Sequence, residues 1–447
     1  MAHSSHVGDV RRLLVISYHF PPDGSVGGLR WAGLSKYLAR RGWEVHVVTA
    51  SRQAAHAPVP GVTVHHRRRN DTLNDIYNRV ASRLRSTPPS GARAQASASG
   101  DIAKADAAMV QPRAIGLLGR LRFNLSIALA FPDRGRGWIL TAAFAARTLL
   151  RQHRFDAVVT SGPPHSAHLA GAMACLGRME PHWVDMRDPF ATGAEYTWAR
   201  DPFNPPGMRA LIPHLERLFF RHARGIITNT PELRDVLRAG HSALDVSFIP
   251  NGIDRERLPS PDVARYPGVS IAYAGTLYLG RDLTPVLRAI RGLFSEFPEA
   301  ARDVKLRMAG SMEGGRGETF WHEVDAQGLR DAVEFLGSVS GATALDLMNR
   351  SHINVVLAQQ QPTQVPAKLY ECVAMGNTTL VITESTSAAA REARRIGATT
   401  FEADDITGIQ AFVQKVWRNP PVRIAVSDDI SYEGIAAEVD ALLLRGQ

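Results

Sequence analysis

The chain has 447 residues, of which 45% are hydrophobic and 21% are charged, as in a globular protein and unlike a disordered one. Its length predicts two domains, and no apolar run reaches the ~20 residues that a membrane-spanning helix needs. The formal net charge of +9 favours an acidic partner, namely nucleic acid, an anionic membrane surface or a phosphorylated substrate. Because no zinc-finger, RNP or basic-zipper pattern is present, we expect no nucleic acid among the partners.

The N-terminus and the cysteines predict the compartment. Residues 1–12 are polar and lack the apolar core of a signal peptide. Cys175 and Cys372 are far apart in the sequence, which fits a reducing compartment and offers no metal cluster. We therefore expect a cytoplasmic protein.

A βαβ unit is predicted at the start of the chain. Residues 13–18 form a continuous apolar run, typical of a strand that is buried on both faces of a parallel sheet. A loop rich in Gly and Pro follows and ends at Gly27 and Gly28; residues 29–41 then have helical spacing and residues 44–49 predict the second strand. In doubly wound sheets ligands bind at such a loop. The two glycines could admit a ligand or simply form a tight turn.

The next segments predict a strand, an insert and a helix. Residues 62–66 read as a strand, and residues 86–113 shift to Ser, Ala, Pro and Gly, which predicts a mobile insert. Residues 115–130 form a basic amphipathic pattern. Such a helix can lie on an anionic membrane or pack on the sheet.

A second α/β passage contributes the polar candidates of the first half. Residues 138–152 predict a helix whose apolar residues are Leu140, Phe144, Leu149 and Leu150. Residues 155–160 predict a strand that leads to His165. A histidine just beyond a strand end can point into a ligand crevice or have a structural role. After the next strand, three charged residues could orient a hydroxylated acceptor or pair with one another: Asp185, Arg187 and Asp188.

The α/β pattern restarts after residues 248–254, so we predict three parts. Residues 1–250 form an N-terminal domain, residues 251–425 a C-terminal domain, and residues 426–447 a helix that packs back on the N-terminal domain. Two consecutive α/β domains imply an interdomain cleft.

Residues 365–376 carry the most informative motif of the second half. Val365 and Pro366 open a helix with apolar spacing, and Lys368 and Glu371, three residues apart, share a face. The amides of a helix start and a lysine favour an anion, and a glutamate can accept hydrogen bonds from two ribose hydroxyls. The alternative is a capped surface helix.

In order along the chain, six motifs resemble those of the retaining glycosyltransferases of family 4, which have the GT-B fold of two Rossmann-like domains. They are residues 18–22 with Gly27 and Gly28, residues 161–165, residues 185–189, residues 249–254, residues 274–277 with Gly280 and Arg281, and residues 366–371.

The resemblance implies an enzyme that takes a nucleotide-diphosphate sugar as donor and a saccharide or lipid-linked hydroxyl as acceptor. It implies that residues 1–250 bind the acceptor and residues 251–425 the nucleotide sugar. It places Glu371 on the donor ribose, Lys368 and Arg281 beside the diphosphate, and His165 beside the transferred sugar. Gly275 and Thr276 would line the donor site, and Gln364 the sugar. It implies no cofactor and no metal, and a role in polysaccharide or glycolipid synthesis, with peripheral attachment to the inner membrane face as an option.

Two positions depart from the family pattern. Thr363 stands at the first Glu of the E-x7-E element, and Thr276 stands where the family has an Arg. These departures bear on donor-sugar identity. They keep two alternatives open: another enzyme on the same fold, such as a nucleotide-sugar epimerase or a sugar phosphorylase, and a non-catalytic subunit of a polysaccharide assembly complex.

Overall fold

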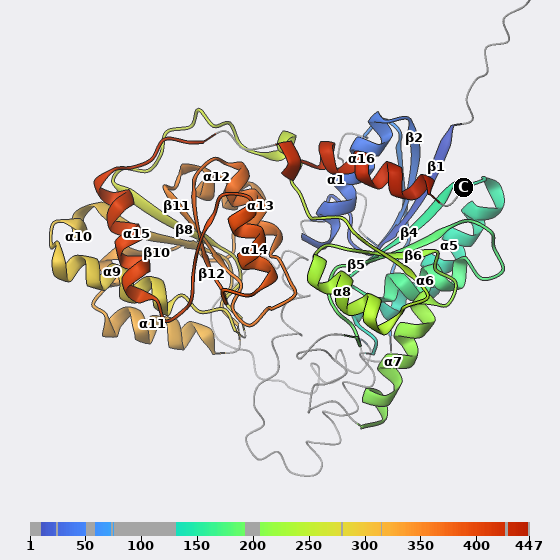
Figure 1. The fold of residues 1–447 in the computed structure, drawn as a ribbon, viewed down its shortest axis with the longest axis horizontal. Helices are drawn as coiled ribbons and strands as arrows, with labels where there is room; N and C mark the ends of the chain where they lie inside the picture. The colour runs from blue at the N-terminus through green and yellow to red at the C-terminus, as the bar shows by residue number, and fades with distance from the viewer. Residues whose placement is uncertain are drawn as a thin grey trace, which may run out of the picture. The chain divides into compact units, whose positions relative to one another are not determined.

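The computed structural model describes residues 10–23, 26–50, 59–72, 75, 131–192, 206–278, 280–313, 315–424 and 428–445. The chain divides into two compact units (Figure 1). Unit 1 takes in the described residues up to Pro250 and again from Tyr432, and unit 2 runs from Asn251 to Ser431. The predicted insert at 86–113 and the amphipathic helix at 115–130 lie outside the described residues, so both stay predictions.

Unit 1 contains a seven-stranded parallel sheet in the order β3-β2-β1-β4-β5-β6-β7. Its strands are β1 (Arg11–Ser17), β2 (Trp43–Thr49), β3 (Val62–His66), β4 (Ala157–Gly162), β5 (His182–Met186), β6 (Gly225–Thr228) and β7 (Asp245–Phe248). In β1, Leu13 and Val15 enter one apolar cluster and Leu14 and Ile16 enter another. The continuous apolar run therefore reflects burial on both faces, as predicted.

Helices cover both faces of this sheet. They are α1 (Val26–Arg40), α5 (Ile139–Gln152), α6 (Ser166–Ala174), α7 (Pro206–Phe220), α8 (Pro231–Gly240) and α16 (Tyr432–Leu444), with the 3-10 helix η1 (Arg134–Trp138) before α5. Helices α1 and α16 share one apolar cluster, and α5 and α6 share another. Helix α8 begins with a capping residue and a proline: the Thr230 hydroxyl accepts from Leu233 N at 3.2 Å, and Pro231 follows it.

The apolar stripe predicted for α5 was wrong at its first turns. Leu140 is 66% exposed and Phe144 is 75% exposed. The buried face consists instead mainly of alanines: Ala142, Ala143, Ala145, Ala146, Leu149 and Leu150. Small side chains let α5 pack closely on its neighbours, which a search for large apolar residues does not detect.

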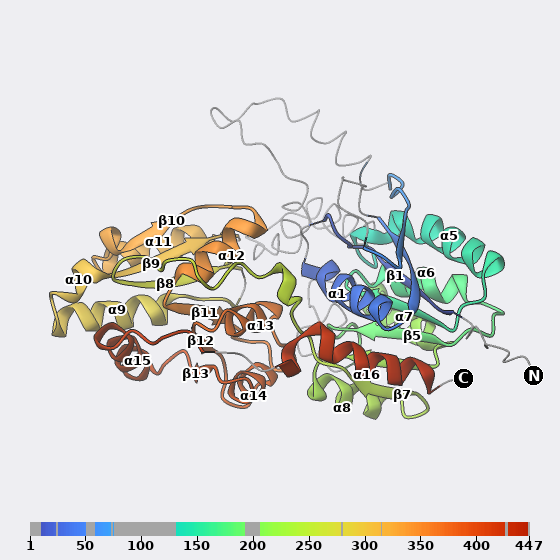
Figure 2. The ribbon, with the colours of Figure 1, turned by 90° about the horizontal axis from the view of Figure 1, so that it is seen from above.

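Unit 2 contains a six-stranded parallel sheet in the order β10-β9-β8-β11-β12-β13. The strands are β8 (Val269–Ala274), β9 (Val304–Ala309), β10 (Val333–Phe335), β11 (Ile353–Leu357), β12 (Thr378–Ile382) and β13 (Thr399–Phe401). The helices are α9 (Thr284–Glu296), α10 (Ala300–Asp303), α11 (Arg316–Ala326), α12 (Gly341–Arg350), α13 (Ala367–Ala374), α14 (Ala388–Arg395) and α15 (Ile406–Arg418), with 3-10 turns at Arg255–Arg257, Arg330–Ala332 and Asp428–Ile430. Helices α9, α11 and α15 share one apolar cluster and α12, α13 and α14 the other (Figure 2).

Counted from the first strand of each unit, both sheets follow the order 3-2-1-4-5-6, which is the Rossmann order, and unit 1 adds a seventh strand. The predicted α/β class with two Rossmann-like units is confirmed; the interdomain cleft stays a prediction. Both cysteines are buried and unpaired, and burial raises the pKa of each thiol to about 12. Within the described ranges, no helix has both the length and the apolar character needed to cross a membrane.

Helix α16 returns the chain to unit 1 and lies along α1 (Figures 1 and 2). Its buried Asp440 accepts hydrogen bonds from Arg11 Nη1 at 2.9 Å, Arg41 Nε at 3.1 Å and Trp43 Nε1 at 2.9 Å. At the other end of α16, the Tyr432 ring fills the space that a Cβ on Gly33 would occupy, 2.2 Å from its Cδ2. The helix is therefore held at both ends.

We expect Asp440→Ala to lower the free energy of unfolding by about 3 kcal/mol, because it leaves one indole and two guanidinium donors unpaired. The matched control is Glu438→Ala, an exposed position on the same helix. Urea denaturation of both variants checks this, and equal midpoints would contradict it.

Two buried histidines lie within hydrogen-bond distance of one hydroxyl, that of Thr160 in strand β4. Thr160 Oγ1 lies 3.0 Å from His168 Nδ1 and 3.1 Å from His182 Nε2. Burial lowers the pKa of His182 to about 4 and that of His168 well below its usual value. Both imidazoles are therefore neutral in the folded protein at neutral pH.

We expect the free energy of unfolding to decrease as the pH is lowered from about 6.5 to about 4. Histidines of the unfolded chain take up protons near pH 6.5, whereas His182 in the folded protein does so only near pH 4. The free energy of unfolding should drop by about 2 kcal/mol for each buried histidine between about pH 6.5 and pH 5. Denaturation midpoints at several pH values check this. The slope should be smaller in His182→Gln, and an unchanged slope would contradict the assignment.

Candidate functional site

The strand order creates one topological switch point in each unit. The order reverses between β1 and β4 in unit 1, and between β8 and β11 in unit 2. Ligands of open α/β sheets bind beyond the carboxyl ends of the strands at this point, where the loops diverge. The loops after these four strands carry most of the residues that the sequence predicts for the site.

In unit 1, the glycines at the start of α1 let it approach the loop after β1. A Cβ on Gly28 would lie 2.9 Å from His19 C and from Phe20 N, closer than a side chain can come. A Cβ on Gly27 would lie 3.4 Å from His19 Cδ2 and 3.5 Å from Pro163 O, in the loop after β4. Gly28 is therefore required for packing. Both glycines lie in the first turn of α1 and not in the preceding loop, where the sequence predicts them, because the helix begins earlier than predicted, at Val26.

His165 follows β4 and directly precedes α6. Its ring is 8% exposed and lies against Phe190, with the ring centroids 4.7 Å apart. Burial lowers its pKa to about 4, and its Nδ1 has no hydrogen-bond partner among the described residues. That nitrogen is buried. A neutral imidazole can donate to or accept from a sugar hydroxyl, but it carries no charge at neutral pH.

Asp185 and Arg187 are buried and hydrogen-bond to the segments that form this edge of the sheet. The fully buried Asp185 carboxylate accepts from Trp31 Nε1 at 2.8 Å, Ser161 Oγ at 3.1 Å and Arg30 Nε at 3.2 Å. Arg187 Nε donates to Gly162 O at 2.9 Å and lies 3.7 Å from Asp185 Oδ2. These contacts favour the alternative of mutual pairing for these two residues.

The roles of the three charged residues therefore differ. Asp188 is half-buried, unlike Asp185 and Arg187. Its assignment to an acceptor stays a prediction.

In unit 2, helix α13 begins where residues 365–376 predict a helix. Its buried residues are Leu369, Tyr370, Cys372 and Val373. Lys368 and Glu371 are half-buried on the opposite side, and within the described part of the chain neither side chain makes a hydrogen bond or an ion pair. Gly376 follows the end of the helix with φ +71°, a conformation that glycine adopts readily.

The loop after β8 presents a cation. The Arg281 guanidinium carbon lies 4.4 Å from the centroid of the Tyr278 ring, and its buried Nε has no partner among the described residues. Gly275 and Thr276 precede it: Gly275 N donates to Ala309 O at 2.8 Å, and Thr276 Oγ1 lies 3.1 Å from Ser311 Oγ. The aromatic face orients the guanidinium without neutralising it.

A glutamine joins the two loops of this switch point. Gln359 Nε2 donates to Asp282 O at 2.8 Å, and Gln359 Oε1 accepts from Asp282 N at 3.3 Å. Gly280 has a positive φ of +85°, and a Cβ added to it would lie 3.4 Å from Gln359 O. The loop of Arg281 passes close to the loop of Gln359. Arg281 therefore lies in a loop that contacts the loop leading to α13.

The remaining residues assigned to the donor or the sugar lie in the same connection from β11 to α13. Val365 is 7% exposed, whereas Thr363, Gln364 and Pro366 are half-buried. Sequence reasoning missed Gln359 and Tyr278, although both lie in the loops that it singled out. A hydrogen bond between two loops, such as that of Gln359, leaves no spacing signal, and the contact of Tyr278 with Arg281 lies within one irregular loop.

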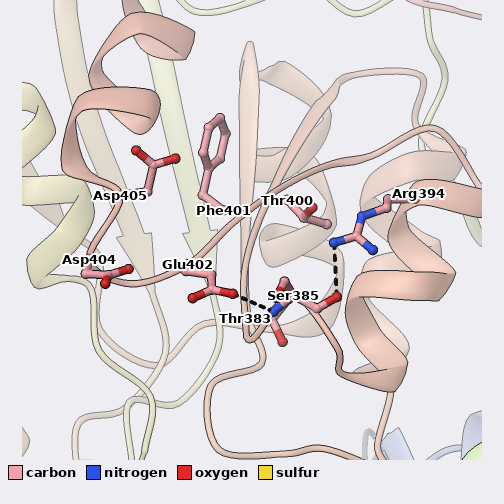
Figure 3. A pocket seen from close by; sticks show the side chains of 8 residues that line it. All are labelled: Thr383, Ser385, Arg394, Thr400, Phe401, Glu402, Asp404 and Asp405. Carbon is pink, nitrogen blue, oxygen red and sulfur yellow. Dashed lines mark hydrogen bonds between the residues drawn. The ribbon is translucent and has the colours of Figure 1, made fainter.

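A depression of about 330 Å³ lies at the ends of β12 and β13 (Figure 3). Strand β12 is the neighbour of β11 in the sheet. Its walls include Arg394, Glu402, Asp404 and Asp405, and none of the predicted site residues. Three carboxylates against one guanidinium make it unsuited to a phosphate. Asp404 and Asp405 are exposed at the start of α15, where Asp405 Oδ1 accepts from Gly408 N and caps the helix.

Part of the chain is similar in sequence to a known protein family. Residues 107–257, about a third of the chain, match the model of Glycosyltransferase Family 4. No curated protein sequence matches the chain.

Solved structures match over nearly the full length. Sucrose-phosphate synthase from Thermosynechococcus elongatus is 12% identical with a TM-score of 0.57, covering 97% of this chain and 98% of that one. Anabaena HepE in complex with UDP-glucose is 13% identical with a TM-score of 0.55, covering 97% and 98%. Trehalose 6-phosphate synthase from Burkholderia multivorans is 14% identical with a TM-score of 0.56, covering 98% and 95%. The predicted resemblance is confirmed to this extent: the chain has the GT-B fold, and its residues 107–257 match the model of Glycosyltransferase Family 4.

Proposed function

We propose that this protein is a retaining glycosyltransferase that moves a sugar from a nucleotide-diphosphate sugar to a hydroxyl of a saccharide or lipid-linked acceptor. We place it in cell-surface polysaccharide or glycolipid synthesis, in the cytoplasm or on the inner membrane face. The observation that carries the proposal is the pair of contacting loops in unit 2. They bring an arginine, a lysine and a glutamate, none of them in a described ion pair, to the switch point of a Rossmann-like sheet.

The donor would bind through opposite charges. Glu371 accepts hydrogen bonds from the ribose hydroxyls, while Lys368, Arg281 and the amides that follow Pro366 face the diphosphate. Anabaena HepE, which has this fold, was solved with UDP-glucose, and this supports a nucleoside diphosphate at the equivalent edge.

The chemistry follows from the leaving group. Breaking the sugar–diphosphate bond leaves negative charge on the nucleotide, which the two cations stabilise more strongly in the transition state than in the ground state. The donor phosphate assists removal of the acceptor proton, so no separate carboxylate base and no metal is needed. Within the described residues, no group of three or more His, Cys, Asp or Glu could hold a metal ion.

Unit 1 would bind the acceptor. The neutral His165, next to the glycines at the start of α1, positions the sugar through its imidazole rather than acting as a nucleophile. The buried Asp185 and Arg187 hold the loops that carry it.

The second candidate is a non-catalytic subunit, favoured by Thr276 and Thr363 at positions where the family has Arg and Glu. Thr276 hydrogen-bonds to Ser311 instead of offering a charge. A thermal-shift panel of UDP, GDP, TDP and their sugars separates the two: a rise in Tm supports the transferase, and a response to none supports the subunit. A nucleotide sugar epimerised without an acceptor would identify an epimerase.

We expect Glu371→Ala to weaken nucleoside diphosphate affinity by about tenfold to a hundredfold, because a hydrogen bond to a charged group contributes about 1.5–3 kcal/mol. Folding should change little, since Glu371 is half-buried and makes no described ion pair. Calorimetric titration measures the affinity. Glu402→Ala, in the depression of Figure 3, is the matched control and should bind like the wild type. Unchanged affinity in Glu371→Ala would remove the ribose assignment.

We expect Arg281→Ala to lower kcat by roughly a hundredfold, the usual cost of one lost transition-state donor. Arg291→Ala, an exposed arginine on α9, is the control. Turnover is measured with the donor that the panel identifies. A kcat within a factor of about two of the wild type would show that Arg281 does not stabilise the leaving group.

A further inference from the structure

A basic surface follows β3 in unit 1. Arg67, Arg68 and Arg69 are consecutive in the sequence, and the first two are exposed. Arg136 in η1 lies beside them, and we call these four residues the arginine cluster. The proposed donor site in unit 2 uses none of them.

The two segments of the arginine cluster are packed together. Asn70 N donates to Gly137 O at 2.9 Å, and a Cβ on Gly137 would lie only 2.2 Å from Asn70 O. Arg136 Nη2 donates to Thr72 Oγ1 at 2.8 Å, and Thr141 Oγ1 donates to Arg68 O at 3.1 Å. The arginines therefore belong to one built surface rather than to two separate loops.

Helix η1 connects this surface to the loop of His165. Asp133, which precedes η1, accepts from Ser166 N and Gly135 N, both at 2.8 Å, and Ser166 is the residue after His165. The ring of Tyr18, at the end of β1, lies edge-on to Trp138 with the centroids 5.4 Å apart. The arginine cluster and His165 therefore lie on the same carboxyl edge of the sheet.

The charges of the cluster are only partly neutralised. Arg69 Nη2 contacts both oxygens of Asp75, at 2.9 and 2.8 Å. Burial tends to raise the pKa of Asp75, but hydrogen bonds from Thr72 and Arg69 outweigh it and lower that pKa to about 2. In contrast, Arg136 Nη1 is buried without a hydrogen-bond partner among the described residues, and Arg67 and Arg68 have no described carboxylate partner.

Such an arrangement suits an anion. A buried guanidinium nitrogen without a partner is unfavourable, and a ligand oxygen would satisfy it. Guanidinium groups bind phosphate through pairs of hydrogen bonds. The Tyr18 hydroxyl, which makes no hydrogen bond to a described residue, can donate a further one.

We propose that the arginine cluster, with the Tyr18 hydroxyl, binds a phosphate group of the acceptor. This inference rests on the proposed function and narrows it to a phosphorylated acceptor whose phosphate lies on the β3 side of the His165 loop. The phosphate can belong to a lipid headgroup or to a free sugar phosphate.

The test uses the full chain with Arg281→Ala and Lys368→Ala combined, so that the donor site no longer binds phosphate. Inorganic phosphate and pyrophosphate are titrated calorimetrically into this background. We expect binding to persist, and to weaken by about tenfold or more when Arg136→Gln is added. Arg68→Gln, at an exposed position, is the second variant should Arg136→Gln fail to fold. Arg151→Gln, an exposed arginine on α5, is the control and should bind like its background.

Flotation with vesicles of phosphatidylglycerol and phosphatidylcholine distinguishes the sources. Flotation that depends on Arg136 or Arg68 supports a lipid headgroup, and phosphate binding without flotation supports a soluble phosphate. Loss of all phosphate binding in the double variant, or equal binding in the Arg136, Arg68 and Arg151 variants, would overturn the proposal. Nucleotide binding by the wild type reports separately on the proposed function, so failure of either is distinguishable.

Discussion

The structure depends on one topological constraint, the reversal of strand order in each parallel sheet. Parallel strands present all their carboxyl ends at one edge, and right-handed crossovers place successive helices on one face until the order reverses. At that point the two loops leave toward opposite faces. The loops after β1 and β4, and those after β8 and β11, are the pairs affected. His165 lies in the loop after β4, Arg281 lies in the loop after β8, and the loop after β11 leads to α13. Their local sequences do not show that these residues occupy equivalent edges of the two sheets.

The polar groups at these edges divide into two kinds. Asp185, Asp133 and Gln359 are saturated by neighbouring donors and acceptors, and they hold loops that lack the regular hydrogen bonds of helix or sheet. Arg281 and Arg136 each keep a buried nitrogen without a partner among the described residues. The first kind is expected to shape the loops and the second to meet a ligand, because a native fold rarely leaves buried polar groups unsatisfied.

This division gives the net charge of +9 a physical interpretation. Several arginines elsewhere pair with carboxylates, as Arg395 does with Glu392 and Asp429. The cations at the carboxyl edges are less fully neutralised. If the acceptor is phosphorylated, both substrates bring phosphate to these edges, and the excess positive charge is complementary to them.

The sequence by itself determined the elements and the fold class. Apolar runs such as residues 13–18 require burial on both faces, and the glycine after α13 and the proline at the start of α8 act within a single helical turn. Such signals are local, so they can be read without a structure. Only the tertiary structure decided which side of α5 is buried, that Asp185 supports the edge from inside, and that Gln359 joins two loops separated by 77 residues. It also brought Arg136 to Thr72, 64 residues away, and so created the arginine cluster. These facts depend on which strands become neighbours, and the spacing of residues along the chain does not encode that.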